Sequence, residues 1–168
     1  GTTAQSVAVS ADSATSQLSV AGSGGGALVG VGITGDTLVL EKETTAYIGD
    51  DARVRSGGDV SVDANAKADL LQIALSINGG LVGVTGAAGV TVANNTTSAS
   101  IGNRAVVFAE DSIRVQATDD TEVDAIVITG SGGAVGVSGS VGVYTIKSST
   151  SATIGDNATI TALAEDAG

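Results

Sequence analysis

Apolar and polar residues alternate in short stretches along the chain. Residues 60–63 read Val-Ser-Val-Asp, residues 113–116 read Ile-Arg-Val-Gln, and residues 52–55 read Ala-Arg-Val-Arg. A period of two is typical of half-buried β-strands, and the abundance of Gly, Val, Thr and Ser disfavours helix. Between residues 44 and 96 we predict five short strands, over 44–48, 52–56, 59–64, 68–77 and 81–93, bounded by Gly-Asp and Gly-Gly turns.

The same pattern recurs along the chain without gaps. The Ile-Gly pair at residue 48 returns at 101 and 154, which gives a constant spacing of 53 residues. The register divides the chain into a partial copy (1–43), two full copies (44–96 and 97–149) and the start of another (150–168), within a single domain. Apolar and Gly positions are kept between copies, whereas charged positions drift. This is the substitution pattern of a stacked core with a free surface.

Short strands repeated without helical spacers favour an all-β, right-handed parallel β-helix. Its coils would stack at about 4.8 Å. A unit of 53 residues fits either two coils or one broad coil; we expect about two coils per unit. We also expect rows of Val, Ile, Leu and Ala inside, with Ser, Thr, Asp and Lys outside. Ile48, Ile101 and Ile154 should then form one stacked column.

Two long stretches, Leu70–Asn95 and Ala125–Ile146, carry no charge. Each is long enough to span a bilayer as a helix. Their Gly, Thr and Ser content makes poor helices, and they lack basic and aromatic flanks. We therefore expect buried strands that turn at Asn78-Gly79-Gly80 and Ser131-Gly132-Gly133, and no membrane insertion. A membrane-inserting toxin segment is the alternative.

Composition narrows the functional classes further. The 168 residues include no Cys, His, Met or Pro, and their net charge is −11. Such a charge repels nucleic acid and anionic membranes, and a chain without Cys or His cannot build thiol or imidazole chemistry. Because the chain starts at Gly1 and contains no Met, we expect it to be a segment of a longer protein.

The repeat resembles that of large filamentous-haemagglutinin-like exoproteins, and of their leukotoxin-type repeats in particular. The resemblance lies in residues 46–54 (Ala-Tyr-Ile-Gly-Asp-Asp-Ala-Arg-Val), 57–64 (Gly-Gly-Asp-Val-Ser-Val-Asp-Ala) and 152–160, with a weaker instance at 99–107. It covers essentially the whole chain. The resemblance implies a right-handed β-helical shaft, export across a Gram-negative envelope, and a role in adhesion or biofilm formation.

Acidic residues are the remaining candidates for chemistry. Some β-helical enzymes cleave polysaccharides with clustered acids, and the candidates here are Asp50, Asp51, Asp59, Asp119, Asp120, Glu122 and Asp124. Asp at turns is favoured by backbone hydrogen bonding alone, and the chain has few aromatic residues for sugar stacking. Asp50, Asp51 or Asp156 could hold Ca²⁺ incidentally. We predict no catalytic, cofactor or metal site and no enzyme activity, with a polysaccharide-active enzyme as a further alternative.

The sequence thus predicts a structural repeat shaft of a secreted or surface-anchored bacterial adhesin or extracellular fibre. Its expected partners are neighbouring repeats of the parent chain, further copies stacked head to tail, and an unidentified cell-surface receptor. The open ends of such a fragment would otherwise present unpaired strand edges.

Overall fold

The computed structural model describes residues 5–163, which form nine β-strands and no helix. The strands are β1 (Val7–Gly26), β2 (Val29–Ile48), β3 (Arg53–Ser56), β4 (Val60–Gly79), β5 (Val82–Ile101), β6 (Val106–Ala109), β7 (Ile113–Gly132), β8 (Val135–Ile154) and β9 (Thr159–Ala162). The prediction of an all-β parallel solenoid is confirmed. Three parallel sheets contain β1-β4-β7 (sheet A), β2-β5-β8 (sheet B) and β3-β6-β9 (sheet C).

Each coil of the solenoid uses one complete repeat unit. Every strand pairs with the equivalent strand of the next unit, as Val7 with Val60 and Val60 with Ile113 show. Ile48, Ile101 and Ile154 pair in one column, as predicted. Our expectation of two coils per unit was wrong. One whole unit runs only once around the axis, because two of the three strands in each coil are 20 residues long.

The prediction of five short strands per unit was wrong for the same reason. The segments expected at 59–64 and 68–77 belong to one continuous strand, β4, and the segment at 44–48 is the end of β2. Residues 65–67, which separate the two expected segments, lie within β4. Lys67 lies on an outward position of an unbroken strand, where charge is tolerated.

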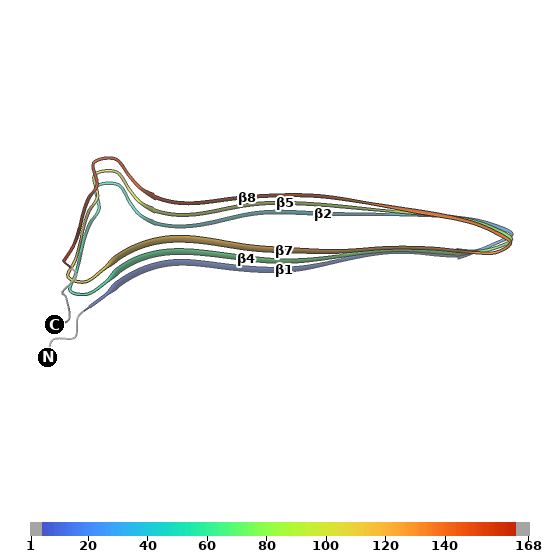
Figure 1. Cartoon of the computed structure of the whole chain (residues 1–168), viewed down its shortest axis with the longest axis horizontal. Coiled ribbons are helices and arrows are strands. Elements are labelled where there is room, and N and C mark those ends of the chain that lie inside the picture. Colours follow the sequence, from blue (N-terminus) through green and yellow to red (C-terminus); the bar gives the residue numbers. More distant parts are fainter. Residues whose placement is uncertain (1–4, 164–168) are drawn as a thin grey trace.

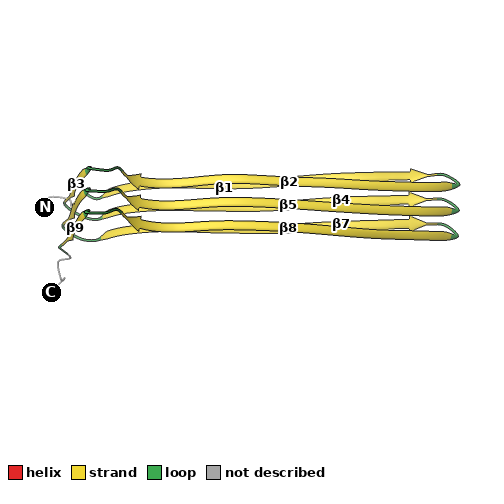
Figure 2. Ribbon diagram, turned by 90° about the horizontal axis from the view of Figure 1, so that it is seen from above, coloured by secondary structure: helices red, strands yellow, loops and turns green. Residues whose placement is uncertain are grey.

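Sheets A and B face each other and approach towards one end of the molecule (Figure 1). At this end, which we call the tip, the chain turns from sheet A to sheet B at residues 27–28, 80–81 and 133–134. The Gly-Gly signal therefore marks a corner between two sheets. At the other end, the base, sheet C closes a triangular cross-section, and the three coils stack with their long strands side by side (Figures 1 and 2).

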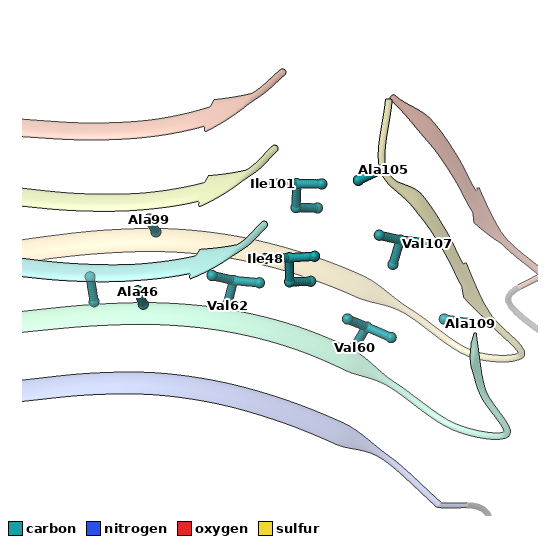
Figure 3. Packing of buried hydrophobic residues seen from close by; sticks show 10 residues of the cluster. Ala46, Ile48, Val60, Val62, Ala99, Ile101, Ala105, Val107 and Ala109 are labelled. Atoms are coloured by element: carbon teal, nitrogen blue, oxygen red, sulfur yellow. The ribbon is translucent and has the colours of Figure 1, made fainter. Parts of the chain in front are cut away.

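The apolar core lies at the base. Ala46, Ile48, Val60, Val62, Ala99, Ile101, Ala105, Val107 and Ala109 point into the triangular space between the three sheets (Figure 3). Val60, Val62 and Val107 are completely buried in the middle coil. Further along, Leu38, Leu70 and Ala93 form a second, smaller cluster. In this half the predicted apolar rows do lie inside. Lys42, Thr44, Thr97 and Asp119 also point inward, however, which contradicts our expectation that Thr, Asp and Lys lie outside.

Between this second cluster and the tip, the pattern is reversed, which contradicts our expectation. In β4 the inward residues are Gln72, Ala74, Ser76 and Asn78, whereas Leu71, Leu75 and Ile77 point outward. The apolar positions change from even to odd numbers at Leu70–Leu71, but the strand continues without a bulge. Because alternate residues of a strand face opposite sides, this change moves the apolar residues to the surface.

Small inward residues allow the sheets to approach each other at the tip. A Cβ atom added to Gly32 would overlap the side-chain amide of Asn78 from the facing sheet. A Cβ atom on Gly80, in the turn itself, would overlap the backbone carbonyl of Ala27 in the coil before. The glycines are therefore required by close backbone packing as well as by the turn.

Candidate functional site

The acidic residues that we considered as catalytic candidates lie in three separate places. Asp50 and Asp51 lie in the turn between β2 and β3, and Asp59 lies directly before β4. The others lie on β7: Asp119 points inward, whereas Asp120, Glu122 and Asp124 point outward. Asp119 accepts hydrogen bonds from the hydroxyl groups of Thr97 and Thr121. The structure therefore does not bring the seven residues into one site.

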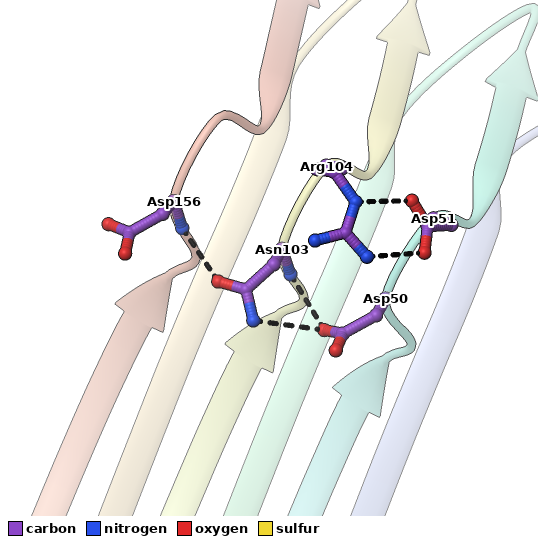
Figure 4. A network of polar contacts seen from close by, with 5 residues as sticks. All are labelled: Asp50, Asp51, Asn103, Arg104 and Asp156. Carbon is purple, nitrogen blue, oxygen red and sulfur yellow. Dashed lines mark hydrogen bonds and ion pairs between the residues drawn. The ribbon is translucent and has the colours of Figure 1, made fainter.

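The β2–β3 turn carries a ladder of side chains that links the coils (Figure 4). The Oδ1 atom of Asp50 accepts a hydrogen bond from the backbone N–H of Asn103 at 2.7 Å. One coil further on, Oδ1 of Asn103 accepts one from the backbone N–H of Asp156 at 2.9 Å. An Asp or Asn at this position satisfies a backbone donor in the next coil. These residues explain the Gly-Asp and Gly-Asn signals structurally, without a ligand.

The next position of this turn has a left-handed backbone in all three coils. The φ angles are 57° at Asp51, 55° at Arg104 and 57° at Asn157. Asp and Asn tolerate this conformation better than Arg. Arg104 is stabilised there by a two-pronged pair with Asp51, with its Nε and a terminal nitrogen 2.7 and 2.6 Å from the two carboxylate oxygens. The replacement of an acid by Arg104, which weakens the sequence motif, thus adds an ion pair between coils.

Two carboxylates at the base are held in their charged form. Hydrogen bonding from Arg104, helped by its positive charge, lowers the pKa of Asp51 below its ordinary value. Hydrogen bonds from the hydroxyl and backbone N–H of Ser112 lower the pKa of Asp59. The Asp59 backbone N–H in turn donates to the Ser6 hydroxyl, so this corner also links consecutive coils. Lowered pKa values indicate charge-stabilising hydrogen bonds, not acids suited to donate protons near neutral pH.

Some of the polar side chains inside the tip half bind one another, whereas the Thr85 hydroxyl and the Asn78 amide nitrogen have no hydrogen-bond partner among the described residues. The hydroxyl of Thr91 donates to Oε1 of Gln72 at 2.8 Å, and both side chains are fully buried. The hydroxyl of Ser23 lies 2.6 Å from that of Thr34 and 2.9 Å from that of Ser76. These contacts join sheet A to sheet B and one coil to the next. They replace the apolar core where the sheets are close together.

Lys42 is the charged residue most deeply placed in the interior of the first coil. Its side chain is 9% exposed, and its ammonium group donates to the backbone carbonyls of Ser13 at 2.8 Å and Lys67 at 2.6 Å. Ser13 and Lys67 lie on adjacent strands of sheet A. Lys42 therefore joins sheet B to two coils of sheet A, which is a structural role.

The base half of the outer face of sheet A is acidic, whereas its tip half presents the apolar Val20, Ile77, Ile126 and Ile128. The charges are those of the base half, which carries eight charged residues: Asp12, Asp63, Lys67, Asp69, Arg114, Asp120, Glu122 and Asp124. Asp69, Glu122 and Asp124 line a shallow hollow together with Ser16 and Leu18. Glu122 and Asp124 were among the candidates predicted from the sequence. Asp69 was missed, although the repeat spacing places it directly beside Glu122.

The outer face of sheet B is largely apolar. Its tip half presents Val29, Val31, Ile33, Val39, Val82, Val84, Val135, Val137, Val141 and Val143, each more than a third exposed. Among its described strands, three charged residues point outward: Glu41, Glu43 and Lys147. Contiguous exposed apolar surface of this kind marks interaction sites. The sequence does contain a signal for this face: along each strand, the apolar residues shift from inward to outward positions. We missed this signal.

Neither a metal centre nor a spanning helix is found between residues 5 and 163. That part of the chain holds no group of three or more acidic side chains placed to ligate a metal ion. It also holds no helix long and apolar enough to cross a membrane. Comparisons with protein-family models, curated proteins and solved structures gave no match to this chain.

Proposed function

We propose that this chain is a structural segment of a longer stacked rod, the shaft of a secreted or surface-anchored bacterial exoprotein. The shaft would hold adhesive parts of the protein away from the cell and so serve adhesion or biofilm formation. One observation carries the proposal: all strands pair with their equivalents in the next unit, in one unbroken register. An object built in this way grows in length by adding units, and each unit contributes a similar stability.

The two end coils support a rod that continues. Each sheet has a middle strand with two neighbours and two outer strands with one neighbour each among the described residues. The outer strands are β1, β2 and β3 in the first coil and β7, β8 and β9 in the last. Inward residues of β8 such as Ile146 and Ile154 are half-exposed, because β8 is the last described strand of sheet B and has a neighbour on one side. Further units of the parent chain, or a second copy stacked head to tail, would cover these edges.

Removal of one internal unit tests the stacked architecture. A variant lacking residues 44–96 joins equivalent positions and should fold as a shorter solenoid. The slope of its unfolding free energy against denaturant concentration should be smaller by about a third. This slope is proportional to the surface exposed on unfolding, and the variant lacks one of three coils. A variant that fails to fold would indicate one indivisible domain and contradict the additive rod.

Labelling of cells tests the proposed location and role. Antibodies raised against the chain should label intact cells that produce the parent protein. Labelling that requires permeabilised cells would contradict a surface shaft.

An assay with acidic polysaccharides tests the alternative of an enzyme. The purified chain should release no sugar from them; turnover that is lost in a Glu122→Gln variant would show an enzyme instead.

A further inference from the structure

The outer face of sheet B is apolar in its tip half and carries few charges elsewhere, whereas the base half of the outer face of sheet A is acidic. We propose that this face binds the same face of a second copy, side by side, so that two solenoids pair along their length. This pairing is lateral and therefore separate from the stacking of coils along the axis. The two copies would be related by a two-fold axis parallel to the strands, in front of β5.

The two-fold axis places strands of unlike coils opposite each other. Strand β5 faces β5 of the second copy, and β2 faces β8 of the second copy in the same direction. Each residue of β2 then lies opposite its equivalent two units later, because β2, β5 and β8 pair in one common register. Such an isologous contact is closed and stops at two copies.

The face is complementary to itself in shape under this operation. Ile33, the most exposed large side chain of the face at 80%, lies opposite Gly139 of the second copy. Gly86 of the middle strand lies in the same row as Ile33 and Gly139. In the next outward row Gly35 lies opposite Val141 of the second copy, with the small Ala88 in the middle strand. A protruding residue thus meets a glycine on each side of the axis. The aliphatic rows nearer the tip, such as those of Val84, meet their own equivalents.

The face is also complementary in charge. Glu41 in β2 and Lys147 in β8 occupy the same position along the strands, with Asn94 between them in β5. Under the two-fold axis, Glu41 of each copy lies opposite Lys147 of the other. The remaining outward charge of the face, Glu43, lies opposite Ser149. The pairing therefore makes two ion pairs and no contact between like charges.

The area is sufficient for a reversible dimer. From Val29 to Glu41 the face is thirteen residues long and three strands wide. At about 3.3 Å per residue and about 4.8 Å per strand, this corresponds to about 600 Å² on each copy. The total of about 1,200 Å² lies at the lower end of specific interfaces.

Two observations select a second copy over a lipid bilayer and over sheet A. In the 168-residue chain by itself, with no further units stacked on it, the described strands β2 and β8 have unpaired edges that could not enter hydrocarbon. A sheet-to-sheet contact leaves those edges in water. The outer face of sheet A also has an apolar tip half, but the same two-fold operation in front of β4 would place Asp63 and Asp69 opposite their own equivalents, and it would form no ion pair to offset them.

Sedimentation equilibrium of the 168-residue chain at physiological ionic strength tests the dimer. The average mass should rise with concentration from 16.0 kDa and level off at twice that value. Lys147→Glu should weaken the dimer about tenfold, because two attractive pairs become repulsive, and the added Glu41→Lys should restore it. Lys67→Glu, with the same change in net charge on sheet A, is the control and should change the dissociation constant less than about twofold.

The orientation is tested by cross-linking, since the chain has no cysteine. Single Val84→Cys and Asn94→Cys variants should each form dimers with a short bismaleimide, because both residues face their equivalents across the axis. Ile77→Cys, on sheet A, should not. Melting curves followed by circular dichroism verify that each variant folds.

Three results would overturn the proposal. The first is that the chain stays monomeric at every concentration and binds phosphatidylcholine vesicles, and that Val84→Lys abolishes this binding. The face would then bind lipid. The second is a mass that rises without limit and is insensitive to Lys147→Glu, which would indicate stacking of coil edges alone. The third is a dimer that Val84→Cys and Asn94→Cys both fail to cross-link.

Discussion

Truncation of one isoleucine column measures how much stability comes from stacking. Ile48, Ile101 and Ile154 occupy the same position in three coils, and their side chains are 6%, 1% and 55% exposed. Ile101 is covered by coils on both sides and packs within the base core beside Val62. Ile101→Ala should therefore cost about 3–4 kcal/mol, from lost burial and the cavity left behind.

The same substitution in the end coil should cost much less. Ile154 keeps about half of its surface in water, so its removal loses about half of the 1.5–3 kcal/mol for burying an Ile and leaves no closed cavity. We expect about 1 kcal/mol for Ile154→Ala. The chemistry of the two substitutions is identical, so their difference of about 2–3 kcal/mol reports the covering coil.

Urea unfolding of both variants and of the parent chain, followed by circular dichroism, gives these free energies. Measurements at low protein concentration avoid association between copies. Equal losses in the two variants would refute the reasoning, because Ile101 and Ile154 would then share the same surroundings.

Three further predictions concern single contacts. Gly80→Ala should destabilise the chain by about 2 kcal/mol or more, because the new Cβ would overlap backbone of the neighbouring coil; an unchanged melting temperature would contradict this packing. Thr91→Val should cost about 1–3 kcal/mol in urea unfolding by leaving buried Gln72 without its donor, whereas adding Gln72→Leu should recover most of the loss; no recovery would show that the hydrogen bond is not the cause. The pKa of the Asp51 carboxyl, followed by NMR titration, should lie below its ordinary value and rise in Arg104→Gln. Because the folded pKa is lowered, the stability that this carboxylate contributes is present above the unfolded pKa and is lost as the pH falls through the folded pKa; an unshifted titration would exclude the pair.

The constant repeat spacing was sufficient to predict parallel stacking and the isoleucine column. A stacked coil places equivalent residues next to each other, so kept apolar positions report contacts directly. The number of coils per unit was not predictable in this way. The spacing between equivalent residues is the same whether a unit forms one coil or two. The number of coils depends on whether a strand continues through residues 65–69.

The reversed tip half was missed because apolar runs were assigned to the interior by composition. Leu71, Leu75 and Ile77 look like core residues, and their outward direction follows from counting alternation onward from Val60. Asp50 was predicted correctly as a turn residue. The ion pair of Arg104 with Asp51 was missed, although the repeat spacing places the two residues side by side in adjacent coils. The change from Asp to Arg was interpreted only as drift at a solvated position.

The unbroken 20-residue strands make the chain unequally sensitive to changes in its length. Loss or gain of one residue within β4 would exchange every inward and outward side chain beyond that point, and would put Leu71 and Ile73 where Gln72 now binds Thr91. Loss or gain of one whole unit leaves each surviving neighbour in place. Genes of this kind should therefore vary in length by whole units, with single-codon insertions and deletions confined to the short turns.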